Sequence, residues 1–374
     1  MCYKPLSGLT VIAIEQAVAA PMCTVRLADA GARVIKIERP EGETARNYDT
    51  AVHGTSAYFA WLNRGKESAV LNLKTDPDRG LLDAMLAQAD VLVQNLVPGA
   101  LDRMGLTKDY IAQHFPRLIS VSILGYGQET AYADMKAYDM LVQAESGLCA
   151  VTGTPEVPSK VGVSAADIAT GMNAHALILE ALIARGITGR GQSIEVSMFD
   201  GIADWMAVPL LHYEHGGIET GRFGLSHASI YPYRPFACND GTVIVAVQNN
   251  HEWARLCDRV LGRPDLTTHD AFRTNAERVT NRALLDAEVD PIFASRSTAD
   301  MITALTAGGI AYARYTGVSD LPDHPALRRT NVTLAGGQVV TMPRPAGRGP
   351  AFATGPVPGL GEHTDAVRAE FGTV

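Results

Sequence analysis

The sequence predicts an α/β protein with a doubly wound, Rossmann-like large domain and a small α+β domain, joined by extended linkers. Three observations predict this architecture. Short apolar runs alternate with helical segments through the first ~120 residues, as expected of a parallel sheet covered by helices. Glycine-rich segments interrupt the pattern at residues 216–224. A strong hairpin signal, Asn239-Asp240-Gly241, then separates two further apolar runs.

The large domain is predicted to begin with a β-α-β unit. A strand at Leu9–Glu15 is followed by a helix ending at Ala30 and a strand at Ala32–Glu38, which implies parallel strands with a right-handed crossover. The first turn, Ala17 to Pro21, lacks G-x-G-x-x-G, so NAD or FAD is not supported. The alternation continues with predicted strands at Ser68–Leu73, Asp90–Asn95 and Leu118–Ser122 and predicted helices at Gly80–Ala89 and Lys108–His114.

A long helix is predicted from Ile168 to Ala184, where nearly every residue is apolar or small. Arg185 and Gly186 suit its C-terminal end. Asp167 therefore lies at or near the N-terminus of a mostly buried helix. Its carboxylate either caps the helix, which is a common role for aspartate, or takes part in chemistry.

The small domain is predicted at residues 226–318. The large domain covers residues 1–200 and is completed by residues 335–374, with linkers at 201–225 and 319–334. The proline- and glycine-rich residues 342–361 are expected to run as an extended strap. Within the small domain the predicted strands are Ser229–Ala237, Thr242–Val247 and Ala311–Gly317, and the predicted helices are His251–Leu261, Asn281–Ala294 and Thr298–Ala307.

Composition limits the possible partners. The net charge of −8 is spread over 374 residues without a basic cluster, so we expect no nucleic-acid partner. The five cysteines, one of which is Cys2, are scattered without metal-ligand spacing, which indicates reduced thiols and no metal site. No signal peptide and no membrane span are recognised. The sequence therefore predicts a cytoplasmic protein.

Several motifs follow predicted strands of the large domain: Arg39; Asn72-Leu73-Lys74; Asn95 to Gly99 with Arg103; and Gly125-Tyr126-Gly127. Together with Lys136-Ala137-Tyr138-Asp139, the SGLCAVTG run and GVSAADIATGM, they resemble the family III CoA-transferases (CaiB/BaiF type). That superfamily includes formyl-CoA transferase and α-methylacyl-CoA racemase. The resemblance extends over essentially the whole chain.

The resemblance implies that Asp167 is the family's nucleophile. A carboxylate can attack a thioester, form a mixed anhydride and then carry CoA as an aspartyl thioester. We expect the N–H groups at the helix N-terminus to stabilise the oxyanion and keep Asp167 ionised, with Ser164 as the cap. Tyr138 is implied as a neighbour of Asp167, or else as a structural tyrosine. The residues implied around CoA, which would be a substrate and not a resident cofactor, are Arg39, Leu71, Lys74, Asn95, Leu96, Arg103, Lys136 and Met198.

The acceptor acid is expected to meet the small domain, where Arg222, His227 and Tyr233 are the candidate substrate residues. A cation beside His227 would suit a second carboxylate, so the expected acceptor is a small dicarboxylic acid or else a short hydroxy or branched acid, with a succinyl-CoA-like donor. His227 can equally be a loop histidine without a ligand. The glutamine of formyl-CoA transferase in the first turn is replaced by Val18, which argues against formate and oxalate. The resemblance also implies an interlocked homodimer.

Two alternatives remain from the sequence. In the racemase branch a histidine and a glutamate join the aspartate, but their positions hold Tyr138 and Gln248 here. Those two departures argue against an α-methylacyl-CoA racemase or epimerase. The second alternative is a CoA-binding protein without catalytic activity, in which Asp167 is a helix cap.

Overall fold

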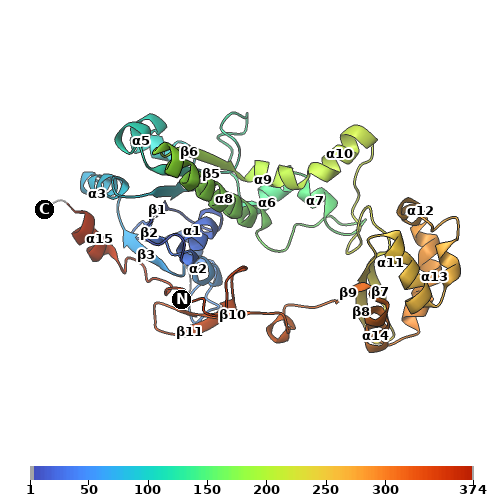
Figure 1. Cartoon of the computed structure of the whole chain (residues 1–374). Helices are drawn as coiled ribbons and strands as arrows, with labels where there is room; N and C mark the ends of the chain where they lie inside the picture. Colours follow the sequence, from blue (N-terminus) through green and yellow to red (C-terminus); the bar gives the residue numbers. More distant parts are fainter. Residues whose placement is uncertain (1–3, 373–374) are drawn as a thin grey trace. The chain divides into compact units, whose positions relative to one another are not determined.

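The chain divides into a large unit and a small unit in a computed structural model, which describes residues 4–372 (Figure 1). The large unit contains the residues up to Cys149, Lys160–Leu211 and the residues from Arg328 onward. The small unit contains Ala150–Ser159 and His212–Leu327. Cys2 lies outside the described residues.

A parallel sheet in the order β3-β2-β1-β4-β5-β6 organises the large unit. This confirms the predicted doubly wound α/β fold. Strand order reverses between β1 and β4, which makes this pair the topological switch point, where open α/β sheets place their ligands. The strands are β1 (Thr10–Ile14), β2 (Arg33–Glu38), β3 (Lys66–Val70), β4 (Val91–Gln94), β5 (Ile119–Leu124) and β6 (Ser193–Ser197).

Helices cover both faces of this sheet because its strands are apolar on both sides. In β1, Val11 and Ala13 pack on one side with α1 and α8, whereas Ile12 and Ile14 pack on the other with α3 and α5. The helices of the large unit are α1 (Ala19–Asp29), α2 (Ala57–Leu62), α3 (Asp76–Leu86), α4 (Ala100–Arg103), α5 (Lys108–His114), α6 (Asp139–Glu145), α8 (Ala165–Thr188), α9 (Met198–Trp205) and α15 (Thr364–Phe371).

Helix α8 extends beyond its predicted end. Arg185 does not serve as a terminal cation, because it is buried and donates to the Asp90 carboxylate at 2.8 Å. Gly186 is helical, and the helix ends at Gly189, which adopts the left-handed conformation with φ 73°. Near its start α8 approaches α1 closely. A Cβ on Gly171 would lie 2.4 Å from the Ala19 carbonyl oxygen, so only glycine fits there.

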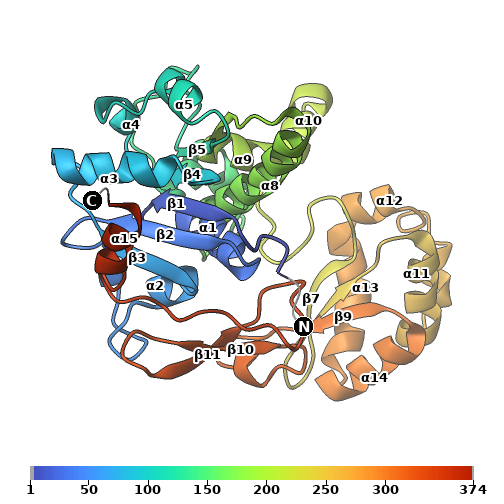
Figure 2. The ribbon, with the colours of Figure 1, turned by 60° about the vertical axis from the view of Figure 1, so that its left-hand side comes forward.

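The C-terminal segment completes the large unit and covers the edge strand β3 (Figure 2). The backbone of Gly65 donates to Pro356, and that of His363 donates to Ser68. Strands β10 (Arg329–Thr333) and β11 (Val339–Pro343) form an antiparallel hairpin whose Val332 packs against Phe59 of α2. This hairpin places the return to the large unit at Arg328 instead of residue 335.

The small unit is built on the antiparallel sheet β7-β8-β9, with the predicted hairpin at Asn239 to Gly241. Helices pack on it around Trp253, Phe236 and Phe293, whose two phenyl rings stack at 4.2 Å. Its elements are β7 (Tyr233–Ala237), β8 (Thr242–Ala246), α11 (Asn250–Arg255) continued by a π-helical turn (Leu256–Leu261), α12 (Asn275–Thr280), α13 (Arg282–Ala294), α14 (Thr298–Gly308) and β9 (Ala311–Arg314).

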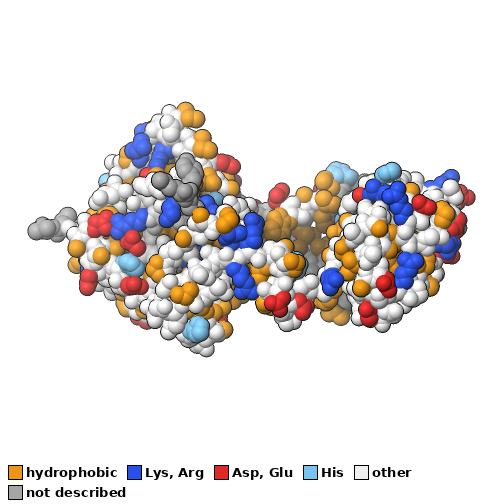
Figure 3. Space-filling model, turned by 60° about the horizontal axis from the view of Figure 1, so that its bottom comes forward, with side chains coloured by type: hydrophobic (Ala, Val, Ile, Leu, Met, Phe, Trp, Pro, Cys, Tyr) orange, Lys and Arg blue, Asp and Glu red, His pale blue; other side chains and the backbone are white. Residues whose placement is uncertain are grey.

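The predicted linker at 201–225 is partly helical. Helix α9 continues to Trp205, and α10 (Ala207–Gly216) follows with exposed apolar side chains at Val208 and Leu211. A short helix α7 (Leu148–Val151) lies where the chain passes from the large unit to the small one. Within residues 4–372 no helix has both the length and the apolar composition to cross a membrane. On the face drawn in Figure 3, basic and acidic side chains are interspersed.

Candidate active site

A cavity of about 660 Å³ lies at the carboxyl ends of β1 to β4, next to the switch point of the sheet. Loops after these strands and the first turns of α3 and α4 form its wall. Five of the residues that were expected around CoA line this cavity: Arg39, Leu71, Lys74, Leu96 and Arg103. The fold therefore brings together residues that are up to 64 positions apart in the chain.

Three cations of this cavity have no acidic partner among the described residues. Arg39 donates its Nε to the Gly42 carbonyl at 2.8 Å, and Arg103 donates to the Pro98 carbonyl at 3.3 Å. Lys74 forms no side-chain hydrogen bond within residues 4–372. Because a carbonyl does not neutralise a guanidinium, the cavity favours an anionic ligand such as phosphate.

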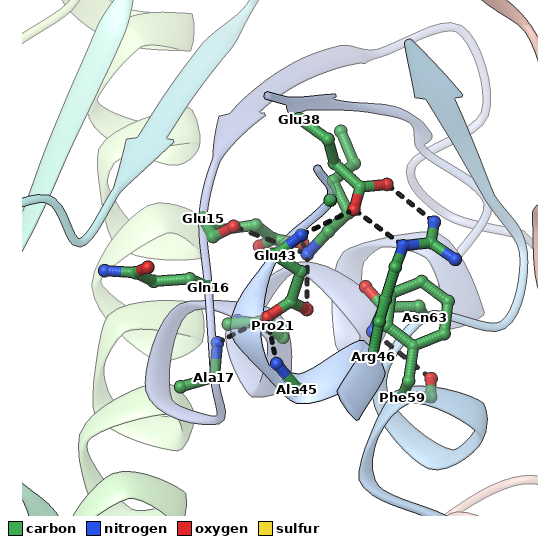
Figure 4. Close-up of polar contacts among 12 residues, drawn as sticks. Glu15, Gln16, Ala17, Pro21, Glu38, Glu43, Ala45, Arg46, Phe59 and Asn63 are labelled. Atoms are coloured by element: carbon green, nitrogen blue, oxygen red, sulfur yellow. Dashed lines mark hydrogen bonds and ion pairs between the residues drawn. The ribbon is translucent and has the colours of Figure 1, made fainter. Parts of the chain in front are cut away.

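Buried ion pairs form the floor of the cavity (Figure 4). Glu15 accepts from Lys66 at 2.6 Å and from Lys36 at 3.4 Å, and Lys36 also reaches Glu43 at 3.1 Å. Burial alone would raise the pKa of Glu15, but these two lysines hold it below its usual value. Burial lowers the pKa of Lys66 to about 8. Because these charges are paired with one another, the unpaired charges of the cavity within the described chain are the three cations Arg39, Lys74 and Arg103 and one carboxylate, Asp76, which leaves the cavity net positive.

Asn95 was expected to contact CoA, but its side chain does not line the cavity. Its Oδ1 accepts from the Gln16 backbone N–H at 2.9 Å, and its Nδ2 donates to the Gln16 carbonyl at 2.8 Å. The next residue, Ala17, has φ 61° and donates its N–H to Glu43 at 2.9 Å. The turn between β1 and α1 is therefore held from two sides, and the Gln16 side chain lines the cavity.

Asp167 lies in the first turn of α8, two residues after Ala165. Ser164 is the N-cap residue by position, but its side chain makes no capping bond. Instead, Oδ1 of Asp139 accepts from the backbone N–H groups of Ala166 at 2.8 Å and Asp167 at 3.3 Å. The expectation that these N–H groups are free for an oxyanion is wrong, because a neighbouring carboxylate already occupies them.

Burial and the negative charge of Asp139 raise the pKa of Asp167 to about 7. The expectation that the helix terminus keeps this carboxylate ionised is therefore also wrong. Asp139 is itself held by Gln143, whose Nε2 donates to Asp139 Oδ2 and whose Oε1 accepts from the Val161 N–H, both at 2.8 Å. Gln143 is fully buried, so the chain of bonds is fixed on both sides.

The remaining residues expected around CoA, Met198 and Lys136, and the expected neighbour of Asp167, Tyr138, lie in segments close to α8 in the chain. Met198 is buried and packs against Ala166 and Ala169 in the first turns of α8. Tyr138 immediately precedes Asp139, but its side chain is 70% exposed. Lys136 is exposed on the same loop. Neither Met198, Tyr138 nor Lys136 lines the cavity, so their expected roles stay predictions.

The three candidate substrate residues belong to the small unit. Arg222 donates to the carbonyl groups of Ala150, Thr154 and Pro155, so it holds a loop. His227 stacks on Tyr233 with ring centroids 5.4 Å apart, and its Nδ1 accepts from the Ser229 N–H at 3.0 Å. A neutral His227 ring therefore carries its proton on Nε2.

Sequence reasoning missed Gln16, Arg79 and Asp139 as residues of the site. Arg79 lines the cavity and donates to the Met104 carbonyl at 2.8 Å, while it pairs with Asp83. Arg79 lies near the start of α3, before the first residue of the helix predicted at Gly80–Ala89. No group of three His, Cys, Asp or Glu side chains within residues 4–372 is arranged to hold a metal ion.

Comparison with known proteins agrees with this geometry. The family model described as CoA-transferase family III matches residues 6–364. The chain is 35% identical to an acetyl-CoA:oxalate CoA-transferase from Acetobacter aceti, over 98% of this chain and 96% of that protein. It is 32% identical to a succinyl-CoA:glutarate CoA-transferase from Mus musculus, over 96% and 85% of the two chains.

A solved structure extends the likeness to the fold. A CaiB/BaiF family protein from Brucella suis superimposes with a TM-score of 0.83 and 32% identity, over 99% of this chain and 100% of that chain. The matched region contains both the cavity and the Asp167 helix. The chain therefore belongs to CoA-transferase family III and is a CoA-transferase.

Proposed function

We propose that the protein moves CoA from an acyl-CoA donor to a small carboxylic acid, with Asp167 as the nucleophile. One observation carries this proposal: a carboxylate with a pKa of about 7 lies at the start of α8, where the next residue, Ile168, packs with Val18, two residues after the cavity residue Gln16. A carboxylate with reduced hydration is a better nucleophile than one at the surface.

The chemistry would proceed in steps that need no net proton. An Asp167 oxygen attacks the thioester carbonyl carbon, the C–S bond breaks, and CoA leaves as a thiolate with an acyl-aspartyl anhydride remaining. The thiolate attacks the aspartyl carbonyl carbon of this anhydride, which expels the donor acid as a carboxylate and forms an aspartyl-CoA thioester. The acceptor carboxylate repeats these steps in reverse and leaves as the new acyl-CoA.

The cavity would hold the charged end of CoA. Arg39, Lys74 and Arg103 are cations without acidic partners in the described chain, and CoA carries a diphosphate and a 3′-phosphate. Leu71 and Leu96 supply apolar surface for its base. We keep Lys136 and Met198 as candidate contacts nearer to Asp167, and Tyr138 as a hydrogen-bonding partner for the acyl group.

The acceptor would be a small dicarboxylic acid, with a succinyl-CoA-like donor. The names of the relatives support this class, because oxalate and glutarate are both dicarboxylates. Val18 at the position of the formyl-CoA transferase glutamine argues against oxalate and formate. The relative named for oxalate is nevertheless a reason to include oxalate in the test. His227, Arg222 and Tyr233 remain the candidate residues for acceptor choice.

We also propose a homodimer in a reducing, cytoplasmic setting. Trp205, Val208 and Leu211 on α9 and α10 leave apolar side chains at least half exposed, as expected of a surface that another chain covers. The four cysteines among residues 4–372 are free thiols. Light scattering that finds a monomer at micromolar concentration would refute the dimer.

A mass-spectrometric assay tests the proposed reaction. Succinyl-, acetyl- and propionyl-CoA are offered in turn with a panel of mono- and dicarboxylic acids, including oxalate and glutarate. Asp167→Ala should lower exchange by at least about 1,000-fold, and hydroxylamine should trap the wild-type acyl-aspartyl enzyme. Robust exchange by Asp167→Ala would sink the proposal. Deuterium uptake at the α carbon in heavy water would indicate epimerase chemistry instead.

A further inference from the structure

The backbone of Gln16 is held more firmly than a turn residue requires. Both its N–H and its C=O are bonded to one side chain, Asn95, which follows β4. The neighbouring Ala17 is held in a left-handed conformation, which costs roughly 1 kcal/mol for a residue with a side chain, by a bond to Glu43. Glu43 is in turn fixed by Lys36. A turn with this support fixes the direction in which Gln16 leaves the backbone.

The side-chain amide of Gln16 is not used by the fold. Within residues 4–372 neither its oxygen nor its nitrogen forms a hydrogen bond, and it lines the cavity next to the switch point between β1 and β4. Figure 4 shows that it extends away from the ion pairs of the cavity floor. A half-buried amide on a fixed backbone, with both donor and acceptor unused, is suited to a neutral polar ligand group.

The turn adjoins both the cavity that contains the cations and the first turn of α8. Arg39, Lys74 and Arg103 line the cavity together with Gln16. Two residues after Gln16, Val18 belongs to the same apolar cluster as Ile168, the residue directly after Asp167. Two residues span at most about 7 Å. This turn therefore connects the cavity with the start of α8, and a ligand that binds the cations and extends toward α8 would meet it.

Acyl-CoA has the matching order of groups. Its charged nucleotide end is joined to the thioester by a pantetheine arm that is uncharged and contains two amide groups. We propose that the Gln16 side chain binds an amide of this arm, and that Asn95 is a positioning residue that holds Gln16 instead of a direct CoA contact. This inference rests on the proposed function, since it requires that CoA occupies the cavity.

Calorimetry with two ligands tests the inference on the full-length protein. CoA contains the pantetheine arm, whereas adenosine 3′,5′-bisphosphate lacks it. Gln16→Ala and Asn95→Ala should each weaken CoA binding by about tenfold, the loss of roughly one hydrogen bond, and leave bisphosphate binding within twofold of wild type. Arg39→Ala, the matched control, should weaken both ligands equally.

The double variant separates positioning from independent contacts. If Asn95 acts through Gln16, Gln16→Ala with Asn95→Ala should lose about tenfold in CoA affinity and not about 100-fold. Asn95→Asp keeps an acceptor for the Gln16 N–H and loses the donor for the Gln16 carbonyl, so its CoA affinity should lie between those of wild type and Asn95→Ala. This variant also serves in place of Asn95→Ala if Asn95→Ala does not fold.

The outcomes distinguish the two proposals. A wild-type protein that binds neither ligand refutes the proposed function and this inference together. If wild type binds both ligands, the inference alone fails when Gln16→Ala weakens the binding of CoA and of the bisphosphate equally, or weakens the binding of neither. A 100-fold loss in the double variant refutes the positioning role of Asn95.

Discussion

The Asp139 carboxylate accepts the backbone N–H of Asp167 at 3.3 Å, so two acidic residues share the first turn of α8. A helix N-terminus normally favours a negative charge, but here Asp139 takes that place. Asp167 is left with burial and a like charge, which together raise its pKa. The proposed nucleophile, Asp167, thus has a pKa close to neutral pH.

We expect the rate of CoA transfer to rise with pH through about 7. Only an ionised carboxylate can attack a thioester, and the pKa of Asp167, the proposed nucleophile, is raised to about 7. Below that pH the protonated fraction grows and kcat/KM should fall by about tenfold per pH unit. A pH series of initial rates from 5.5 to 8.5 measures this. A flat profile between pH 6 and 8 would contradict it.

Replacement of Asp139 by asparagine should move this profile to lower pH. The substitution removes the charge that raises the pKa of Asp167, while its oxygen can still accept the helix N–H groups. Its amide nitrogen, however, would face the Gln143 Nε2 donor, so some stability should be lost as well. The pH midpoint of kcat/KM is the measurement. An unchanged midpoint would show that the charge of Asp139 does not raise the pKa of Asp167 and that Asp139 only holds the N-terminus of α8 in place.

Asp167→Asn should stabilise the protein at high pH while it abolishes transfer. The folded-state pKa of Asp167 lies above its unfolded value, so the associated stability is present below pH ~4 and is lost as pH rises through ~7. Removal of the charge should therefore raise the unfolding free energy at pH 8 by up to about 4 kcal/mol, since the pKa is raised by about three pH units at roughly 1.36 kcal/mol each, and by less at pH 5. Urea unfolding at the two pH values measures the difference.

Charge at the cavity mouth should control CoA affinity. Lys74→Ala and Arg103→Ala should each weaken CoA binding about tenfold, and the dependence of affinity on salt should decrease. Lys108→Ala is the control, because Lys108 pairs with Glu195 outside this cavity. Titrations at 50 and 300 mM salt are compared. Equal effects of Lys108→Ala and Lys74→Ala would place the phosphates elsewhere.

Two glycines of α8 should respond oppositely to alanine. A Cβ on Gly171 would lie 2.4 Å from the Ala19 oxygen and 2.6 Å from Met22 Cβ, so Gly171→Ala should destabilise the fold by about 2 kcal/mol or more. Gly186 has open space around its Cβ position, and Gly186→Ala should stabilise the helix by about 0.5–1 kcal/mol. Thermal unfolding of both variants tests the pair.

The sequence predicted the framework well because local patterns determine it. Alternation of apolar and polar runs identified β1, β2, β4 and β5, and the continuous apolar stretch after Asp167 identified α8. The predicted strand at Ser68–Leu73 was displaced from β3 at Lys66–Val70. Lys66 and Lys36 look like solvent-facing strand residues, and they are buried only because Glu15 and Glu43 arrive from other segments.

The site was less predictable because its contacts are long-range. Asp139 lies 28 residues before the N–H group that it accepts, and Asn95 lies 79 residues from Gln16. No local pattern carries such pairings. The motifs indicated which loops line the cavity, but they could not distinguish a side chain that faces the cavity from one that holds its neighbour.

The chain order of the large unit has a consequence for biosynthesis. The edge strand β3 is covered by residues 355–364, and the Gly361 N–H donates to the Ser68 hydroxyl, which in turn donates to Glu38. These covering residues leave the ribosome after the whole small unit has been translated. The edge of β3 therefore stays exposed on the nascent chain until residues 355–364 are synthesised, and chaperones should bind the chain most strongly during that interval.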